Sequence, residues 1–579
     1  MAPMTFQQTW DNVARFWGGV SLDEPDVITD KSRAQREMHD QIAFIDMMER
    51  QIKVNYPVLC AELGKDKLKV TESHEVAHHK FCPYDLKTGF ALTLEADKVL
   101  NNVDQAKYVE NIFTDILCNT HIRNKGDKSI ASVYKRMGQK DNGSNQFWNL
   151  YMRTYEKLWS LPKNSLAKKI NEKIECDAEK LEDIVKKCIY KPDDWPKSMR
   201  EFAKVVKDYV KNISKNGCKG NSSSQGGSKG SSQGNSQGSS GSQKNSQGGT
   251  AQTQPTCNPG QGNQQYKSKS PSDKGLIDEH SAKDFAPKNA QNDKAAEAEI
   301  EKKLKGSAKA AGYDPKRYTR VAAGIGLGNS TTALKWFYKD LASSFDVDLP
   351  EIISHSGSEV PETYIDWEVH DDERRLDIPF SLSQHGAVIP GYTTYQPKYK
   401  KGEFGQRNKT CPDLLVCVDS SGSMANPAQC LSAAVLSAMV AARKALALER
   451  RVAVINFSDR YQHQNYTIDQ EKVDDAIVHY AGGGTLIPGA EILNTVKKNK
   501  NPQHILIISD TCIADLSNQL AYLQQAVQDA KSGGTIFLIN PGAGSSKELE
   551  KIGYDVIRVT DPKDLIGLTL NKTKSIYGV

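Results

Sequence analysis

The C-terminal third of the chain alternates short apolar runs with longer amphipathic stretches. The runs LLVCV, VAVINF, HILIIS and TIFLI are largely apolar, which is typical of strands buried on both faces of a sheet. Stretches with helical periodicity lie between them, such as LSAAVLSAMVAARKALAL, although the segment after VAVINF is expected to be rich in turns. Strands alternating with helices predict right-handed crossovers and a parallel sheet. We therefore predict a doubly wound α/β domain over residues 411–579.

Five polar residues follow or end these runs. Asp419, Ser421 and Ser423 form a D-x-S-x-S pattern after LLVCV, Thr485 lies in GGGT, and Asp510 ends HILIISD. In open α/β sheets ligands bind beyond the carboxyl ends of the strands. Carboxylate and hydroxyl oxygens there suit Mg²⁺ or a similar hard divalent cation. The alternative interpretation is that the Asp and Ser residues only cap the following helices, where both types are preferred.

All five residue types match the metal-ion-dependent adhesion site of von Willebrand factor A (VWA) domains, and this part of the chain resembles that family. The resemblance implies a Rossmann-like VWA fold and a protein partner bound through the metal ion. Similar VWA proteins often work beside MoxR-type AAA+ ATPases, so it also implies a separate ATPase partner. This chain has no usable phosphate-binding loop of its own, because GIGLGNST carries Asn329 where a lysine is needed.

A second motif lies near the N-terminus, in TESHEVAHHKFCPYD. His74, Glu75 and His78 form H-E-x-x-H. Residues four apart share one face of a helix, so both imidazoles can reach one Zn²⁺ ion while Glu75 flanks the metal-bound water. The motif predicts a zinc site with Glu75 as general base. Alternatively, HEVAHH is an exposed helical turn whose histidines bind nothing.

A candidate third zinc ligand lies in the next predicted helix, DQAKYVENIFTDILCNTHI. Its polar residues Asn111, Asp115 and Asn119 recur every fourth position and line one stripe between apolar neighbours. The helix resembles the N-x-x-x-D-x-x-x-N helix of metallopeptidase-like domains found fused to VWA-like domains, and this resemblance implies Asp115 as the third ligand. In gluzincin-like peptidases a Glu occupies the position of Asn111. Glu110 and His79 are the alternative ligands.

Composition divides the chain. From about Lys219 to Gln265 the sequence is almost wholly Ser, Gly, Gln and Asn, and such a segment has no apolar side chains with which to form a core. We expect a mainly α (α+β), zincin-like domain over 1–214 and a disordered linker over 215–295. Helical and β segments that pack on the VWA domain are expected over 296–410. Protease is expected to cut the linker and release two stable fragments.

Charge, hydropathy and cysteine content argue against several classes of protein. The net charge of +5 is small for 579 residues and gives no case for nucleic-acid binding. No run of eighteen apolar residues is present, so no membrane span is expected. The eleven cysteines are scattered singly, which favours a reducing, cytoplasmic compartment over a disulfide framework.

Two functional hypotheses follow. In the first, the protein is a zinc-dependent metallopeptidase whose VWA module docks a partner such as the AAA+ ATPase. In the second, the zinc site is vestigial or structural, and the protein is a non-catalytic VWA adaptor or co-chaperone. A chelatase-type subunit is a third hypothesis. Glu75 favours the first, because a structural zinc site needs no general base. Asn111 favours the second.

Overall fold

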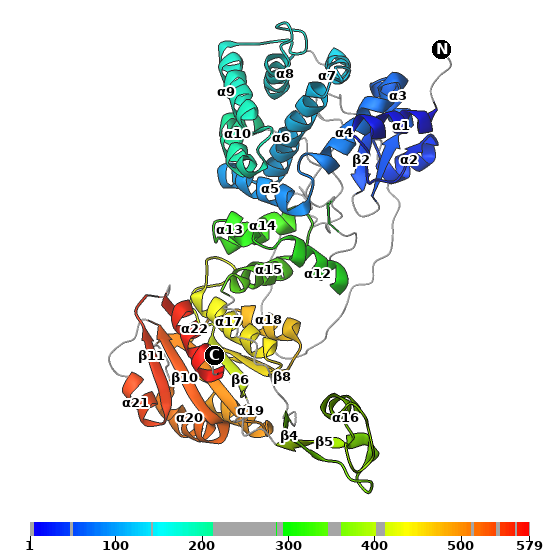
Figure 1. Cartoon of the computed structure of the whole chain (residues 1–579). Helices are drawn as coiled ribbons and strands as arrows, with labels where there is room; N and C mark the ends of the chain where they lie inside the picture. Colours follow the sequence, from blue (N-terminus) through cyan, green and yellow to red (C-terminus); the bar gives the residue numbers. More distant parts are fainter. Residues whose placement is uncertain are drawn as a thin grey trace, which may run out of the picture. The chain divides into compact units, whose positions relative to one another are not determined.

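The structure is a computed structural model, and the residues it describes form two compact units (Figure 1). Unit 1 comprises Met1–Gly312 and Arg317–Ala333, and unit 2 comprises Tyr313–Lys316 and Leu334–Val579. The described residues are 5–46, 50–140, 143–211, 285–286, 293–345, 360–400, 411–510, 515–539, 545–561 and 564–577. The prediction of a multidomain chain with mixed α/β structure is confirmed.

Unit 1 is mainly helical in its described part, with a small three-stranded sheet. The strands β1 (Asp26–Ile28), β2 (Ala43–Asp46) and β3 (Gln51–Asn55) lie in the order β1-β3-β2, with β1 parallel and β2 antiparallel to β3. Its helices are α1 (Phe6–Phe16), α2 (Lys31–Met38), α3 (Tyr56–Glu62), α4 (Leu68–Lys80), α5 (Leu86–Leu100), α6 (Val103–Asn124), α7 (Ile130–Met137), α8 (Gln146–Leu158), α9 (Glu172–Cys188), α10 (Trp195–Val210), α12 (Lys294–Lys303), α13 (Ser307–Ala310) and α14 (Pro315–Gly324).

Helix α6 runs through the core of unit 1. It begins at the N-cap Asn102, whose side chain accepts a hydrogen bond from the backbone N–H of Gln105. Every residue from Val109 to Thr120 is buried, so the helix has no solvent-facing side over this length. Helix α4 packs against it and is itself buried from Val70 to His78. Polar side chains on these two helices must therefore find partners inside the protein, because burial of an unpaired polar group is costly.

The segment after the predicted linker folds back onto α5 of unit 1. The buried carboxylate of Asp97 forms ion pairs with Arg317 and Arg320 of α14. Nearby, Lys98 Nζ donates to the backbone oxygen of Ala310 over 2.7 Å. The linker predicted over 215–295 lies almost wholly outside the described residues, but both of its flanks belong to unit 1.

This arrangement changes the expected result of cutting the chain within the linker. Residues 1–211 and 293–579, produced as two separate chains, are expected to copurify on an affinity tag placed on either one. The carboxylate of Asp97 is fully buried and its two arginine partners are partly exposed, so Asp97→Ala is expected to weaken the association. Glu299→Ala, which changes a carboxylate paired with Lys303 of the same helix, is the control. Complete separation of the wild-type pieces would contradict the assignment of 293–312 and 317–333 to unit 1.

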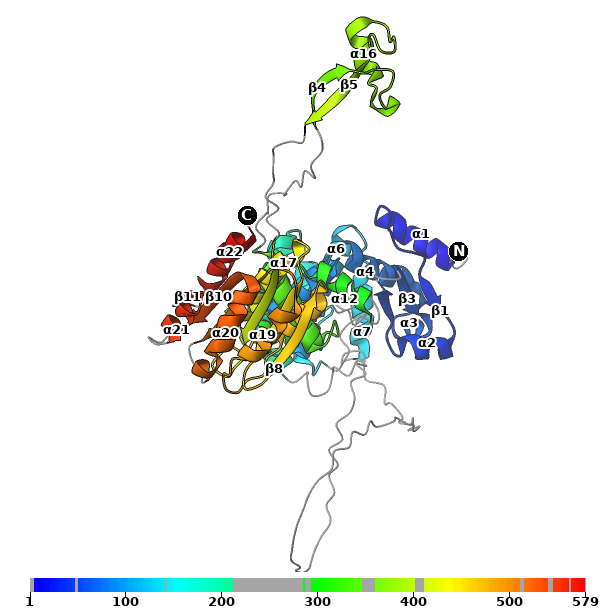
Figure 2. The same cartoon turned by 90° about the horizontal axis from the view of Figure 1, so that it is seen from below.

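Unit 2 is built on a six-stranded sheet with helices on both faces (Figure 2). The strand order is β11-β10-β9-β6-β7-β8, and every pair is parallel except β7 with β8. The sheet strands are β6 (Asp413–Asp419), β7 (Val452–Phe457), β8 (Tyr461–Thr467), β9 (Gln503–Asp510), β10 (Lys531–Ile539) and β11 (Tyr554–Val559). The helices of unit 2 are α15 (Ser330–Ser343), α16 (Ile378–His385), α17 (Ala433–Ala447), α18 (Gln470–Val478), α19 (Gly489–Lys498), α20 (Leu516–Ala530), α21 (Ser545–Lys551) and α22 (Asp564–Tyr577). The division between the units falls inside α15.

Strand β8 differs from the sequence-based expectation of a turn-rich segment. It forms the antiparallel edge of the sheet, and its residues YQHQNYT are exposed or only partly buried. An edge strand of this kind has no apolar alternation, because neither of its faces is fully covered. The central strands β6 and β9, by contrast, are buried along almost their whole length, as the apolar runs predicted.

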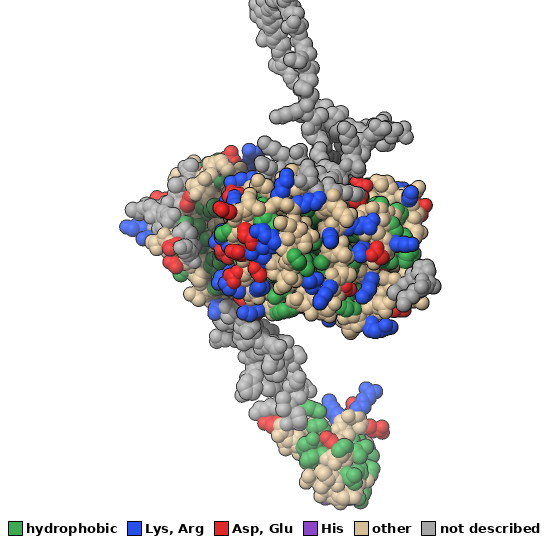
Figure 3. All heavy atoms as spheres, turned by 90° about the horizontal axis from the view of Figure 1, so that it is seen from above, with side chains coloured by type: hydrophobic (Ala, Val, Ile, Leu, Met, Phe, Trp, Pro, Cys, Tyr) green, Lys and Arg blue, Asp and Glu red, His purple; other side chains and the backbone are tan. Residues whose placement is uncertain are grey.

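Residues 296–410 do not behave as one segment. Helices α12, α13 and the greater part of α14 belong to unit 1, whereas most of α15 belongs to unit 2. Strands β4 (Val360–Asp366) and β5 (Tyr395–Lys400) form a separate antiparallel ribbon, on which the ring of Tyr364 stacks against Phe380 of α16. Many large apolar side chains of this ribbon module are exposed (Figure 3): Ile365, Val369, Ile378, Leu382, Ile389, Tyr392 and Tyr399.

Among the helices of the described residues, none combines the length and the apolar character needed to cross a membrane.

Candidate metal centres

Helices α4 and α6 bring three potential metal ligands together in the core of unit 1. His78 Nε2 lies 3.2 Å from Asp115 Oδ1 and 3.3 Å from His74 Nε2, and His74 Nε2 lies 3.6 Å from Asp115 Oδ1. All three side chains are fully buried. Among the described residues, these three form the group of His, Cys, Asp and Glu side chains suited to hold a metal ion.

The separations of these donor atoms fit a small tetrahedral cation. Bonds of about 2.0–2.2 Å from zinc to nitrogen or oxygen place neighbouring ligands of a tetrahedron about 3.3–3.6 Å apart. The three observed separations run from 3.2 to 3.6 Å. Two imidazoles and one carboxylate are also ligands that zinc accepts, and they leave one position open. The residues present therefore fit zinc.

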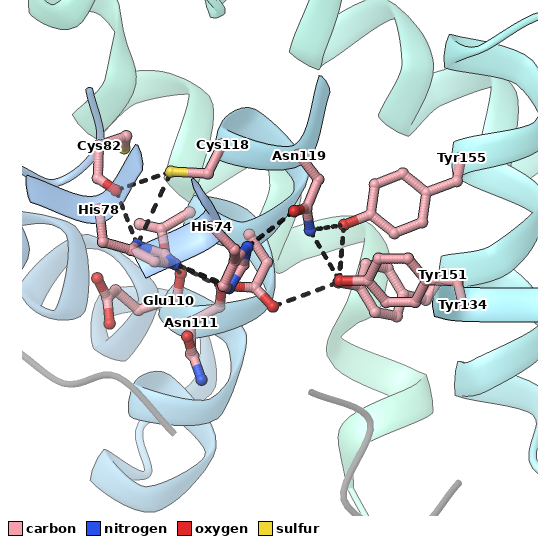
Figure 4. A network of polar contacts seen from close by, with 12 residues as sticks. His74, His78, Cys82, Glu110, Asn111, Cys118, Asn119, Tyr134, Tyr151 and Tyr155 are labelled. Carbon is pink, nitrogen blue, oxygen red and sulfur yellow. Dashed lines mark hydrogen bonds and ion pairs between the residues drawn. The ribbon is translucent and has the colours of Figure 1, made fainter. Parts of the chain in front are cut away.

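The outer nitrogens of both imidazoles are held by oxygen acceptors (Figure 4). His78 Nδ1 lies 2.9 Å from the backbone oxygen of Cys82, and His74 Nδ1 lies 2.8 Å from Asn119 Oδ1. A carbonyl oxygen can only accept, so the neutral His78 ring carries its proton on Nδ1 and turns the lone pair of Nε2 inward. The same holds for His74. Two lone pairs and a carboxylate oxygen then face one another, and a cation at their centre relieves the repulsion.

Asn119 connects this centre to three buried tyrosines (Figure 4). Its Nδ2 donates to the hydroxyls of Tyr134 and Tyr155, each over 2.7 Å. The hydroxyl of Tyr151 lies 2.9 Å from that of Tyr155 and 3.5 Å from Asp115 Oδ2. Burial raises the pKa of all three tyrosines well above the usual value, so their hydroxyls stay protonated. Through this network Asn119 holds His74 and the Tyr151 hydroxyl lies against Asp115.

The other candidate residues of the zinc site are buried or directed away from the three converging donors. Glu75 is fully buried on α4, in the turn that carries His74 and His78. Glu110 and Asn111 are buried on α6 but are not among the three converging donors. His79 is directed elsewhere, because its Nε2 lies 3.3 Å from the hydroxyl of Ser21. The structure thus groups Asp115, rather than either alternative ligand, with the two histidines.

Sequence reasoning missed the supporting residues of this centre. The tyrosines of α7 and α8 carry no recognisable motif, although Tyr151 and Tyr155 are four residues apart and share a helix face. Glu72, which lies two residues before His74 on α4, was also not singled out. It is fully buried, and burial together with the charge of Glu24 raises its pKa to about 8. Its carboxyl group is therefore largely protonated at neutral pH.

A second group of oxygen atoms lies at the carboxyl edge of the sheet in unit 2. Asp419 ends β6, and its Oδ1 accepts a hydrogen bond of 2.8 Å from the backbone N–H of Ser421. The hydroxyls of Ser421 and Ser423 lie 3.1 Å apart. Asp419 and Ser421 are buried, whereas Ser423 is exposed. The D-x-S-x-S segment therefore folds into a tight loop with its oxygen atoms gathered together.

The glycine-rich loop before Thr485 is hydrogen-bonded to this serine loop. The N–H of Gly422 donates to the oxygen of Gly483 over 2.8 Å, and the N–H of Gly482 donates to the oxygen of Ser420 over 2.9 Å. A Cβ atom at Gly422 would lie only 3.2 Å from the oxygen of Gly483, so this close approach favours glycine. Thr485 is buried just beyond the paired glycines.

Asp510 reaches the same edge from the neighbouring strand. Val418 pairs with Ile508, so the ends of β6 and β9 place Asp419 and Asp510 close together. Burial raises the pKa of Asp419, and the nearby charge of Asp510 adds to this rise. Ser509, which the sequence analysis overlooked, donates its hydroxyl to Asp419 Oδ2. Carboxylates and hydroxyls gathered in this way fit Mg²⁺, which prefers oxygen ligands.

Comparisons with known proteins identify no family for this chain. No protein-family model and no curated protein matches it. Among solved structures, it is similar to an aerotolerance-related membrane protein from Bacteroides fragilis, with 15% identity and a TM-score of 0.21. It is also similar to the conserved hypothetical protein BatB from Bacteroides thetaiotaomicron, with 13% identity and a TM-score of 0.21. Each match covers 28% of this chain and 99% of the other. No conclusion about function rests on either match.

Proposed function

We propose that unit 1 is a zinc-dependent hydrolase domain of the metallopeptidase type and that unit 2 is a VWA-like, Mg²⁺-dependent module for binding a protein partner. The convergence of His74, His78 and Asp115 carries the first half of this proposal. The separations of their donor atoms suit zinc. The Nδ1 atoms of the two imidazoles are held by the side chain of Asn119 and the backbone oxygen of Cys82. A structure without a metal-binding role has no evident need for three buried donors facing one another.

Each residue of the zinc centre has a separate task. His74, His78 and Asp115 would hold the ion, and Asn119 and Tyr151 would orient His74 and Asp115. A bound zinc ion would supply Lewis acidity and an activated water molecule. Glu75, on the same helical turn, would accept the proton from that water as general base and deliver it to the leaving group. The buried surroundings strengthen these electrostatic interactions, because the local dielectric is low.

In unit 2 the Mg²⁺ ion would be held by Asp419, Ser421, Ser423, Thr485 and Asp510. The serine loop and the glycine-rich loop are hydrogen-bonded to each other, which supports a site shared between them. An acidic side chain of the partner is a suitable further ligand, since Mg²⁺ binds carboxylate oxygens and retains exchangeable waters. The resemblance to VWA proteins points to a MoxR-type AAA+ ATPase as that partner.

One observation favours a second candidate function. His74, Glu75, His78 and Asp115 are all fully buried, so a polypeptide could reach them only after the covering elements move. A zinc ion held in so enclosed a place would suit a structural role. In this alternative the protein is a non-catalytic adaptor that recruits clients through unit 2.

Glu75→Gln separates the two candidates. The variant is expected to retain about one zinc ion per chain, because Glu75 is not a ligand, and to lose at least 100-fold in hydrolysis, because the general base is removed. Zinc content is measured by elemental analysis and hydrolysis with fluorescent casein and a quenched peptide library. Glu62→Gln, on α3, is the matched control and is expected to leave both unchanged. A zinc-loaded wild type that cleaves none of these probes would favour the adaptor.

A further inference from the structure

Helix α15, which precedes the sheet of unit 2, is held against the segment that follows the serine loop. The fully buried hydroxyl of Tyr338 accepts a hydrogen bond of 2.9 Å from the backbone N–H of Ser432. It also lies 3.2 Å from the backbone oxygen of Pro427 and 3.4 Å from that of Cys430, to one of which it can donate. A single phenolic group thus holds two backbone groups of residues 427–432 at a time, one by accepting and one by donating. Ser432 is in turn the N-cap of α17.

Helix α15 also forms ion pairs with α18. Lys339 Nζ pairs with Glu471 and lies 3.7 Å from Asp474, and Lys335 Nζ lies 3.0 Å from Glu471 and 2.9 Å from Asp475. The side chains of Lys335 and Lys339 are only 11% and 6% exposed. The carboxylates of Glu471 and Asp475 are about half exposed, at 46% and 54%, whereas Asp474 is fully buried. Solvent therefore screens part of each pair, and the lysine ammonium groups connect α15 to α18 from buried positions.

The two segments that α15 holds lead directly to the two halves of the proposed magnesium site. Residues 427–432 follow the serine loop with Ser421 and Ser423, and α18 precedes the glycine-rich loop with Thr485. Between them, the Tyr480 hydroxyl lies 3.2 Å from the backbone oxygen of Ser421 and 3.3 Å from that of Met424. A shift of α15 would therefore move the segments that lead into the serine loop and the glycine-rich loop.

We infer that α15 is a positioning element for the magnesium site, with Tyr338 as its central residue and Lys335 and Lys339 as its anchor to α18. This inference rests on the proposed Mg²⁺ site of unit 2. Tyr338 touches no ligand atom and acts through the backbone of residues 427–432. Ligands that are held in place before binding lose less conformational freedom when the ion binds, so a positioning contact raises the affinity for the ion.

The test compares Mg²⁺ affinity with stability in the full chain. Mg²⁺ binding is measured by titration calorimetry, with Asp419→Ala defining the signal of this site, and the thermal midpoint is measured in EDTA. Tyr338→Phe is expected to weaken Mg²⁺ binding by about fivefold to tenfold, the effect of losing one hydrogen-bonding hydroxyl. Tyr522→Phe, which removes an exposed hydroxyl of α20, is the matched control and is expected to bind like the wild type.

The outcomes separate a positioning role from a merely structural one. A lower midpoint in EDTA with unchanged Mg²⁺ affinity would overturn the inference while leaving the magnesium site intact. No Asp419-dependent Mg²⁺ binding in the wild type would overturn the proposed function and, with it, this inference. Should Tyr338→Phe fail to fold, the double variant Lys335→Gln, Lys339→Gln decides, with a weakening of at least threefold expected and an unchanged affinity contradicting the inference.

Discussion

Replacing His78 by Ala is expected to remove zinc from the protein. The substitution deletes one of three converging donors and leaves His74 and Asp115, which cannot surround the ion on their own. Zinc content is expected to fall from about one ion per chain to near zero in elemental analysis after gel filtration. Unit 1 would also lose its thermal response to zinc and to chelators, because a ligand stabilises only the state that binds it.

The adjacent His79 offers a matched control for this experiment. Its Nε2 lies against Ser21 and outside the donor cluster, so His79→Ala is expected to keep the zinc. Asp115→Ala is expected to weaken zinc binding far more than Glu110→Ala, since Asp115 belongs to the group of three converging donors and Glu110 does not. Loss of zinc in Glu110→Ala with retention in Asp115→Ala would mean that the ligand set is wrong. A metal-free wild type would overturn the zinc centre as a whole.

Asp419→Ala is expected to abolish Mg²⁺ binding by unit 2 and with it the capture of a partner through this site. Asp419 is the buried carboxylate at the end of β6, and its removal takes away one of the two carboxylates of the proposed site. The fold is expected to persist, because the substitution removes a ligand at a strand end and leaves the apolar core unchanged. Removal of a carboxylate that faces Asp510 also relieves a repulsion in the metal-free protein.

The measurement is the rise in thermal midpoint that Mg²⁺ produces, together with calorimetric titration of Mg²⁺. Wild type is expected to respond and Asp419→Ala to show no response, with matching circular dichroism spectra. Asp529→Ala, which changes a partly exposed carboxylate of α20, serves as control and should respond like the wild type. An equal Mg²⁺ response in Asp419→Ala would show that the ion binds elsewhere.

The central strands of unit 2 and the grouping of His74, His78 and Asp115 could be predicted from the sequence. Strands β6 and β9 are buried on both faces, and this burial forces the apolar runs that made them visible. The spacing of His74 and His78, and the position of Asp115 in a polar stripe, follow from helix geometry alone. Where the local pattern reflects the local structure, prediction is possible.

Other features depend on contacts that no local pattern records. Strand β8 exists because it pairs with β7, not because its residues alternate. The hydroxyl of Tyr155 reaches Asn119, and through it the proposed zinc centre, only after helices 36 residues apart in the chain have packed. The return of residues 293–333 to α5 depends on Asp97, Arg317 and Arg320, which are ordinary charged residues in the sequence. Composition suggested a domain boundary at the Ser- and Gly-rich segment, but the contacts place the boundary within α15.

That segment has a different physical meaning once both of its flanks belong to unit 1. It closes a loop within one folded unit, and the covalent path to unit 2 runs through α14 and α15 instead. The entropic cost of joining two ends through a Ser- and Gly-rich chain grows only with the logarithm of its length, so doubling such a chain costs about 0.6 kcal/mol. The length of the segment is therefore expected to matter little for the folding of unit 1. Repeat expansions or deletions in it are expected to leave the covalent connection between the units unchanged.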